Sequence, residues 1–186
     1  MADSLTEIVV ERFYRSKGYL VERDVPIIAA KDGPQFWSDL DILAVKDAVL
    51  LVNCKDFVGD PKQKDRIRDN LRAAEEHVKT HYAQVAAGKQ IVRQMVYMGS
   101  DRKTLEQLQA DGIKCISLDD LLADYLDHLG CFLDSLNRGE PNHKYQPPKG
   151  ARWYRVGNLR GYDKLLVYLL NRKFIATREG KMRKWE

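Results

Sequence analysis

Two short runs of sequence carry carboxylates, an amide and an amine where apolar strand residues would be expected. Asp39 and Asp41 interrupt one β-prone run, and Asn53 and Lys55 end the next. Because successive side chains of a strand point to opposite faces, Asp39 and Asp41 share one face of the first strand, and Asn53 and Lys55 share one face of the second. A charge buried without a partner is costly, so these four residues need a role.

The loop between the two strands decides whether these faces coincide. If it comprises the three residues 46–48, Asp41 lies opposite Asn53. The same register places Asp39 opposite Lys55, whereas a two-residue loop would separate the pairs. The resulting patch suits metal-assisted phosphodiester hydrolysis, because carboxylates hold Mg²⁺ or Mn²⁺ and a nearby amine stabilises developing charge. The alternative is a structural ion pair between Asp39 and Lys55 at the end of a sheet.

The elements that must position this patch follow from the spacing of apolar residues. We expect helices over 4–17, 61–87, 104–110 and 118–136, and strands over 19–28, 36–45, 48–54, 91–98 and 113–117. The helical stripes are Leu5, Ile8, Val9, Arg12 and Phe13 in the first helix, and Ile67, Leu71, Ala74, Val78, Tyr82 and Val85 in the second. The strands 36–45 and 48–54 are apolar enough to be covered on both faces. This order predicts an α/β core with an embedded hairpin.

The order of elements, with Asp41 before the hairpin and Asn53-Cys54-Lys55 after it, resembles the PD-(D/E)xK nuclease superfamily. The resemblance spans roughly residues 5–136, and it implies a restriction-endonuclease-like fold with a mixed β-sheet flanked by helices. It also implies a metal-dependent DNA endonuclease that uses Mg²⁺ or Mn²⁺. By this resemblance Asp41 is a metal ligand, Lys55 is the catalytic lysine, and Glu7 matches a glutamate on the first helix.

The sequence departs from the family pattern at Asn53, where a glutamate or aspartate is expected. An amide oxygen can still bind a cation, and we expect Asn53 and the backbone carbonyl of Cys54 to be auxiliary ligands. Asp39, Glu7 or Glu11 could supply the missing charge. The alternative is a catalytically inactive nuclease-like protein that binds DNA or takes part in an assembly.

Composition and charge bound the class of protein. The 186 residues are 44% hydrophobic and 31% charged, which indicates a globular protein rather than a disordered chain. Three cysteines are too few for a disulfide framework. The first residues lack a basic start followed by an apolar run, and no apolar run is long enough to span a bilayer. We therefore expect a cytoplasmic protein with no membrane partner.

The net charge of +4 is unevenly distributed along the chain. Residues 151–186 hold ten basic and three acidic side chains, or +7, which leaves the first 150 residues at −3. We expect a nuclease domain over 1–137, a proline-rich linker over 138–150 and a small basic C-terminal subdomain over 151–186. The candidate DNA contacts are Lys62, Lys64, Arg66, Arg68, Arg183 and Lys184. The alternatives are intrahelical ion pairs for the first four and a solvated tail for the last two. A homodimer is compatible with cutting two strands.

Overall fold

The computed structural model describes residues 4–29 and 36–138 of the chain. The predicted linker, the C-terminal subdomain and the candidate DNA contacts Arg183 and Lys184 lie outside the described residues. The elements are α1 (Leu5–Ser16), β1 (Leu20–Ala29), β2 (Phe36–Val45), β3 (Ala48–Val58), α2 (Pro61–His81), α3 (Ala83–Ala86), β4 (Gln90–Ser100), α4 (Arg102–Ala110), β5 (Lys114–Ser117) and α5 (Leu118–Arg138).

Five strands form one mixed sheet in the order β1-β2-β3-β4-β5. The pairs β1–β2 and β2–β3 are antiparallel, whereas β3–β4 and β4–β5 are parallel. Strands β2 and β3 therefore lie inside the sheet, as their apolar sequences predict. The α/β architecture with a mixed sheet flanked by helices confirms the predicted fold class.

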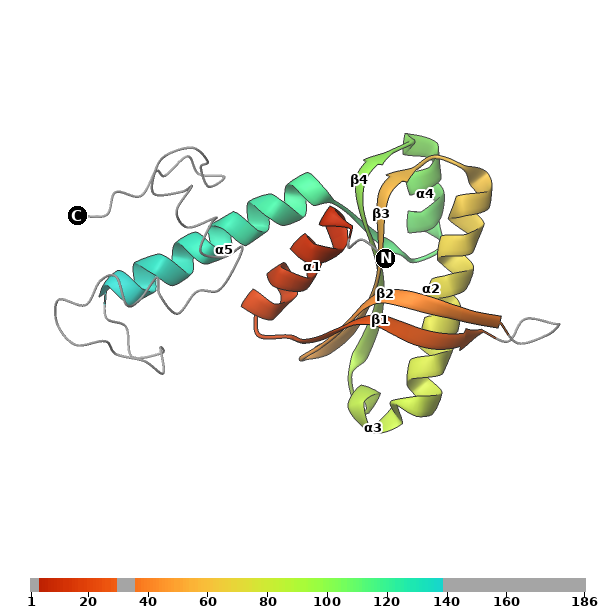
Figure 1. Ribbon diagram of the computed structural model, residues 1–186, viewed down its shortest axis with the longest axis horizontal. Coiled ribbons are helices and arrows are strands. Elements are labelled where there is room, and N and C mark those ends of the chain that lie inside the picture. The colour runs from red at the N-terminus through yellow and green to blue at the C-terminus, as the bar shows by residue number, and fades with distance from the viewer. Residues whose placement is uncertain (1–3, 30–35, 139–186) are drawn as a thin grey trace. The chain divides into compact units, whose positions relative to one another are not determined.

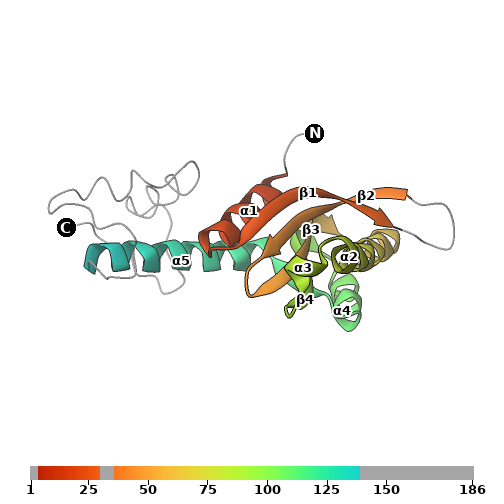
Figure 2. The same cartoon turned by 90° about the horizontal axis from the view of Figure 1, so that it is seen from below.

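Helices cover both faces of the sheet (Figures 1 and 2). Helix α1 lies on one face and α2 with α4 on the other, and α2 contacts β1, β2, β3 and β4. The core under α2 joins its side chains Ile67 and Leu71 to Leu51 of β3 and Met95 of β4, and all four are fully or almost fully buried. This packing fixes α2 across the strands that carry the polar patch. The chain divides into two units after Leu121, so α5 begins in the first and continues into the second.

The buried faces of α1 and α2 agree with the predicted apolar stripes to different degrees. In α2 the predicted stripe is correct from Ile67 to Val78, although Val85 is 40% exposed in α3. In α1 the buried residues are Thr6, Val10, Phe13 and Tyr14, so Phe13 alone of the predicted stripe is buried, and Leu5 is 57% exposed. The physical reason is that the Thr6 hydroxyl donates a 3.1 Å hydrogen bond to Asp56 Oδ1, so this polar residue can face the sheet.

Candidate functional site

The register of the central hairpin is the one that brings the polar residues together. Val45 pairs with Val49 and Ile42 pairs with Val52 in the antiparallel ladder of β2 and β3. The connection between the last paired residues is therefore 46–48, so the three-residue loop, and not the two-residue alternative, joins the strands.

The strands stop pairing beyond Ile42 and Val52, and the side chain of Asp41 fills the gap. Its Oδ2 accepts a 2.5 Å hydrogen bond from the backbone N–H of Cys54 and a 3.3 Å hydrogen bond from Lys55 Nζ. The alternative ion pair between Asp39 and Lys55 is wrong, since the lysine pairs with Asp41. The reason is that Asp41 replaces a backbone partner of β3 and thereby comes within reach of the neighbouring amine.

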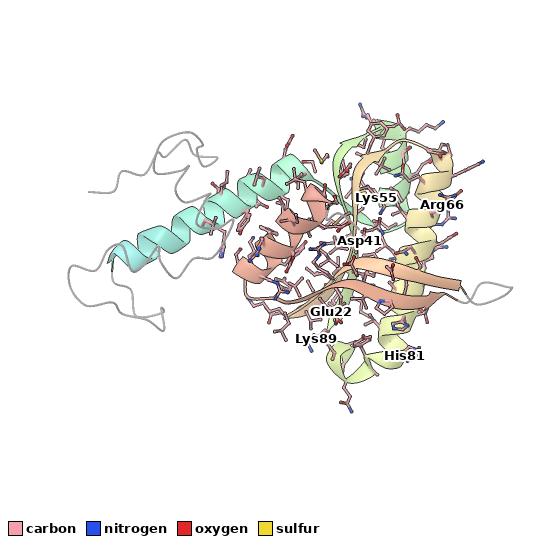
Figure 3. All side chains as sticks on the ribbon, viewed as in Figure 1. Glu22, Asp41, Lys55, Arg66, His81 and Lys89 are labelled. Carbon is pink, nitrogen blue, oxygen red and sulfur yellow. The ribbon has the colours of Figure 1, made fainter. Side chains whose placement is uncertain are left out.

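A pocket with a volume of about 330 Å³ is lined by the four polar strand residues that the sequence singled out. Its lining includes Asp39 and Asp41 of β2 and Asn53 and Lys55 of β3. Helix α2 closes the pocket and adds polar side chains, including that of Arg66. In Figure 3 the labelled residues Asp41, Lys55 and Arg66 lie near one another, whereas Lys89 lies toward the opposite end of the sheet from Lys55. The strand pair and the helix after it thus build a single polar site.

Two amide oxygens in this pocket lack hydrogen-bond partners among the described residues. Asn53 is only 4% exposed, and its Oδ1 is buried and unpartnered. The Oδ1 atom of Asn70 on α2 is also buried and unpartnered. Because a buried acceptor without a donor is unfavourable, both oxygens call for a cation, a water or a substrate donor.

The sequence analysis missed two helix residues that line the pocket. The Gln63 side-chain amide donates a 2.9 Å hydrogen bond to the carbonyl of Phe57. Asn70 Nδ2 donates to Ser38 Oγ at 2.7 Å and to the carbonyl of Asp39 at 3.2 Å. A signal was present, because Gln63, Arg66 and Asn70 recur at helical spacing beside the buried stripe of α2.

The acidic residues of α1 bind a basic strand residue. Glu7 Oε2 lies 3.0 Å from Arg23 Nη2, and Glu11 Oε2 lies 3.6 Å from Arg23 Nη1. Neither glutamate is part of the pocket lining. The pKa of Glu7 is raised mainly by burial and then by the negative charge of Asp41, with Arg23 opposing the shift. The charge of Asp41 therefore acts on Glu7, while the Glu7 carboxylate is held by an arginine.

The four basic residues predicted to contact DNA on α2 have different surroundings. Arg66 lines the pocket, and Lys62 is exposed at the start of the helix. Lys64 lies 3.6 Å from Asp65 Oδ1, and Arg68 Nη1 lies 3.1 Å from the same atom. Arg66 and Lys62 are therefore better placed to meet a phosphate than the two residues already in ion pairs.

Burial shifts the protonation equilibrium of Asp41 in the pocket. It is the largest cause of a raised pKa at Asp41, which the adjacent Lys55 ammonium and Cys54 N–H oppose. Burial likewise raises the pKa of the Cys54 thiol well above its usual value. Cys54 is 3% exposed and does not line the pocket, so its thiol is a buried apolar group.

The donor set of the pocket fits a hard divalent cation. No group of three or more His, Cys, Asp or Glu side chains that could hold a metal occurs among the described residues. The pocket instead combines two carboxylates, Asp39 and Asp41, with the free amide oxygens of Asn53 and Asn70. Mg²⁺ prefers oxygen ligands, often takes only one or two carboxylates and keeps several waters. These residues are therefore compatible with Mg²⁺ or Mn²⁺.

The comparisons with known proteins do not assign the chain to a family. No family model matches the chain, and no curated protein is similar to it. Among solved structures, a crystal structure of a repair endonuclease from Pyrococcus abyssi matches 63% of this chain at 14% identity and a TM-score of 0.42. The match spans 48% of that structure. No described helix is long and apolar enough to cross a membrane.

Proposed function

We propose that the chain is a metal-dependent DNA endonuclease of the PD-(D/E)xK type, which hydrolyses phosphodiester bonds. The observation that carries this proposal is the shared pocket of Asp39, Asp41, Asn53 and Lys55. Two carboxylates, an unpartnered buried amide oxygen and an ammonium group meet there, where the pairing of β2 with β3 has stopped. This combination can hold a cation and bind a phosphate at the same place.

Each residue has a role that its surroundings support. Asp41 and Asn53 provide oxygen ligands, and a bound Mg²⁺ or Mn²⁺ would polarise the phosphate and acidify a water. The N–H of Cys54 points toward Asp41, and the carbonyl of a strand residue leaves on the same side as its N–H. The Cys54 carbonyl therefore leaves β3 on the same side as Asp41, which supports a role as an auxiliary ligand even though Cys54 is not part of the pocket lining.

Lys55 is held close to the reacting groups by an ion pair. Its Nζ lies 3.3 Å from Asp41 Oδ2, and its side chain is 33% exposed. The ammonium can therefore reach both the carboxylate and a phosphate that enters the pocket. We assign Lys55 the task of orienting the attacking water or stabilising charge on the phosphate.

The test is a cleavage assay with Mg²⁺ or Mn²⁺ on single-stranded, duplex and branched DNA. Wild type should cut at least one substrate, and Lys55→Ala should lower the rate by about 100-fold or more. Lys89→Ala is the matched control, because Lys89 lies at the opposite end of the sheet. No cleavage with either metal, or equal rates for Lys55→Ala and wild type, would reject the proposed activity.

A second function has a specific observation in its favour. Asn53 stands where a carboxylate is expected, and the described residues hold no cluster of three acidic or other metal-binding side chains. A nuclease-like protein that binds DNA or joins an assembly without cutting could dispense with that carboxylate. Binding of DNA that is unaffected by EDTA, together with no cleavage, would favour this function. The cytoplasmic location and the homodimer remain predictions from the sequence.

A further inference from the structure

We propose that Asn70 of α2 is a cation ligand of the pocket, so that the helix completes the coordination set begun by the two strands. This inference rests on the proposed function and extends it to a residue outside the strand motif. Two observations on the described pocket support it. Two amide oxygens there have no hydrogen-bond partner among the described residues, and the α1 glutamates are absent from the pocket lining.

The orientation of the Asn70 amide follows from its two hydrogen bonds. Its Nδ2 donates to Ser38 Oγ at 2.7 Å and to the carbonyl of Asp39 at 3.2 Å. A carbonyl only accepts hydrogen bonds, so the nitrogen must face Asp39 and the oxygen must face away from it. Asn70 Oδ1 is therefore fixed, buried and without a donor among the described residues.

Asn53 provides an independent second oxygen in the same state. It comes from β3 on the other wall of the pocket, is 4% exposed and has no partner at Oδ1 among the residues that the structure describes. One unsatisfied buried acceptor could be an accident of packing. Two such acceptors that line one pocket with two carboxylates form a set of oxygen donors for a hard cation.

The α1 glutamates have less freedom to complete this set. Arg23 contacts the carboxylates of both Glu7 and Glu11, at 3.0 and 3.6 Å. Moving either glutamate into the pocket would break an ion pair, whereas Asn70 already lines the pocket. The same amide also fixes the backbone of Asp39, so one residue both supplies an oxygen and positions a carboxylate.

The experiment is calorimetry of Mn²⁺ binding to the full chain in the absence of DNA. Asn70→Ala should weaken Mn²⁺ binding by about 10-fold. Asn70→Asp should tighten it by about 10-fold or more, because the added charge faces the cation. Gln109→Glu is the control for charge alone, since Gln109 is exposed on α4 and outside the pocket lining, and it should leave the affinity unchanged.

The two Asn70 variants should change the Mn²⁺ affinity in opposite directions, and this distinguishes a metal ligand from a structural residue. Neither variant can donate to the Asp39 carbonyl, so a purely structural role would weaken binding in both and would overturn the inference. Thermal melts in EDTA establish that each variant is folded. If Asp41→Asn abolishes Mn²⁺ binding while the Asn70 variants behave like wild type, the inference fails and the proposed nuclease stands. If wild type binds no Mn²⁺, both fail.

Discussion

The surroundings of Asp41 disfavour the charged form of its carboxyl group. Burial raises its pKa, and the hydrogen bonds from Lys55 and Cys54 only partly offset this effect. A raised carboxyl pKa in the folded state means that the stability contribution is present at low pH and is lost as pH rises through that pKa. The carboxylate therefore reduces stability at neutral pH, which is the expected signature of a residue kept for binding rather than for folding.

Asp41→Asn should accordingly be more stable than wild type at pH 8. The amide can still accept from the Cys54 N–H but carries no desolvated charge. The difference in Tm should shrink as pH is lowered through the carboxyl range, as followed by circular dichroism. Asp47→Asn, at the exposed hairpin turn, is the matched control. A lower Tm for Asp41→Asn at pH 8 would show that the ion pair with Lys55 outweighs the burial.

Adding a carboxylate at Asn53 should lower stability without metal and strengthen metal binding. Asn53→Asp would place a third carboxylate, at a 4% exposed position, in the pocket that already holds Asp39 and Asp41. Without metal, the repulsion and burial should lower the Tm below that of wild type. With Mn²⁺, the Tm should rise by more than wild type gains, because tighter binding stabilises the folded state. An equal Mn²⁺ shift in both proteins would place Asn53 outside the metal site.

At the level of elements, the site depends on how α2 begins. Asp60 Oδ1 accepts a 2.9 Å hydrogen bond from the N–H of Lys62, and Pro61 follows at the first helical position. This cap fixes the turn that carries Gln63 and Arg66 into the pocket. The cap thus fixes the start of α2 a few residues after the end of β3, and with it the helix face that lines the pocket.

Asp60→Ala should cost about 1 kcal/mol in the free energy of unfolding, measured with urea, and should also weaken Mn²⁺ binding. Asp101 provides the comparison, because it caps α4 through a 2.9 Å hydrogen bond from the Thr104 N–H and does not line the pocket. Asp101→Ala should destabilise the protein while leaving its Mn²⁺ affinity unchanged. Equal effects of the two variants on binding would argue that α2 does not position the site.

The elements also show which parts of the site local sequence can predict. Strands β2 and β3 and the shared face of Asn53 and Lys55 follow from short-range periodicity, and the structure agrees. The length of the loop between these strands does not follow from periodicity, and the sequence left it open. The predicted end of β3, at 54 rather than Val58, is too early, because the charged run after Cys54 lacks strand periodicity. Its parallel partner β4 pairs with this run, up to Ser100.

The contributions of the helices depend on tertiary contacts and are harder to predict. Asn70 faces the pocket because α2 packs across β2 and β3, and no local pattern gives that crossing. Glu7 has the expected position on α1, but the hydrogen bond from Arg23 joins residues 16 positions apart. Periodicity assigns a face to each residue, whereas the partner on that face is decided by distant parts of the chain.

For the molecule as a whole, the uneven charge predicts how DNA affinity should respond to salt. The net charge of +4 combines the −3 of the first 150 residues with the +7 of residues 151–186. Each phosphate that a basic residue neutralises releases counterions, so log K falls with log salt by about 0.9 per phosphate on duplex DNA. A basic end that grips DNA should therefore contribute to the slope even if the pocket supplies the chemistry.

The double variant Arg183→Gln/Lys184→Gln should make this slope shallower by about 0.9 for each phosphate that the two side chains neutralise, as measured by fluorescence anisotropy over a range of NaCl. Mn²⁺ affinity in the absence of DNA should be unchanged, because the candidate ligands lie within residues 39–70. Lys79→Gln/Lys89→Gln removes the same charge from the first 150 residues and should leave the slope nearly unaltered. If both double variants change the slope equally, the attraction arises from net charge rather than from phosphates bound by the basic end.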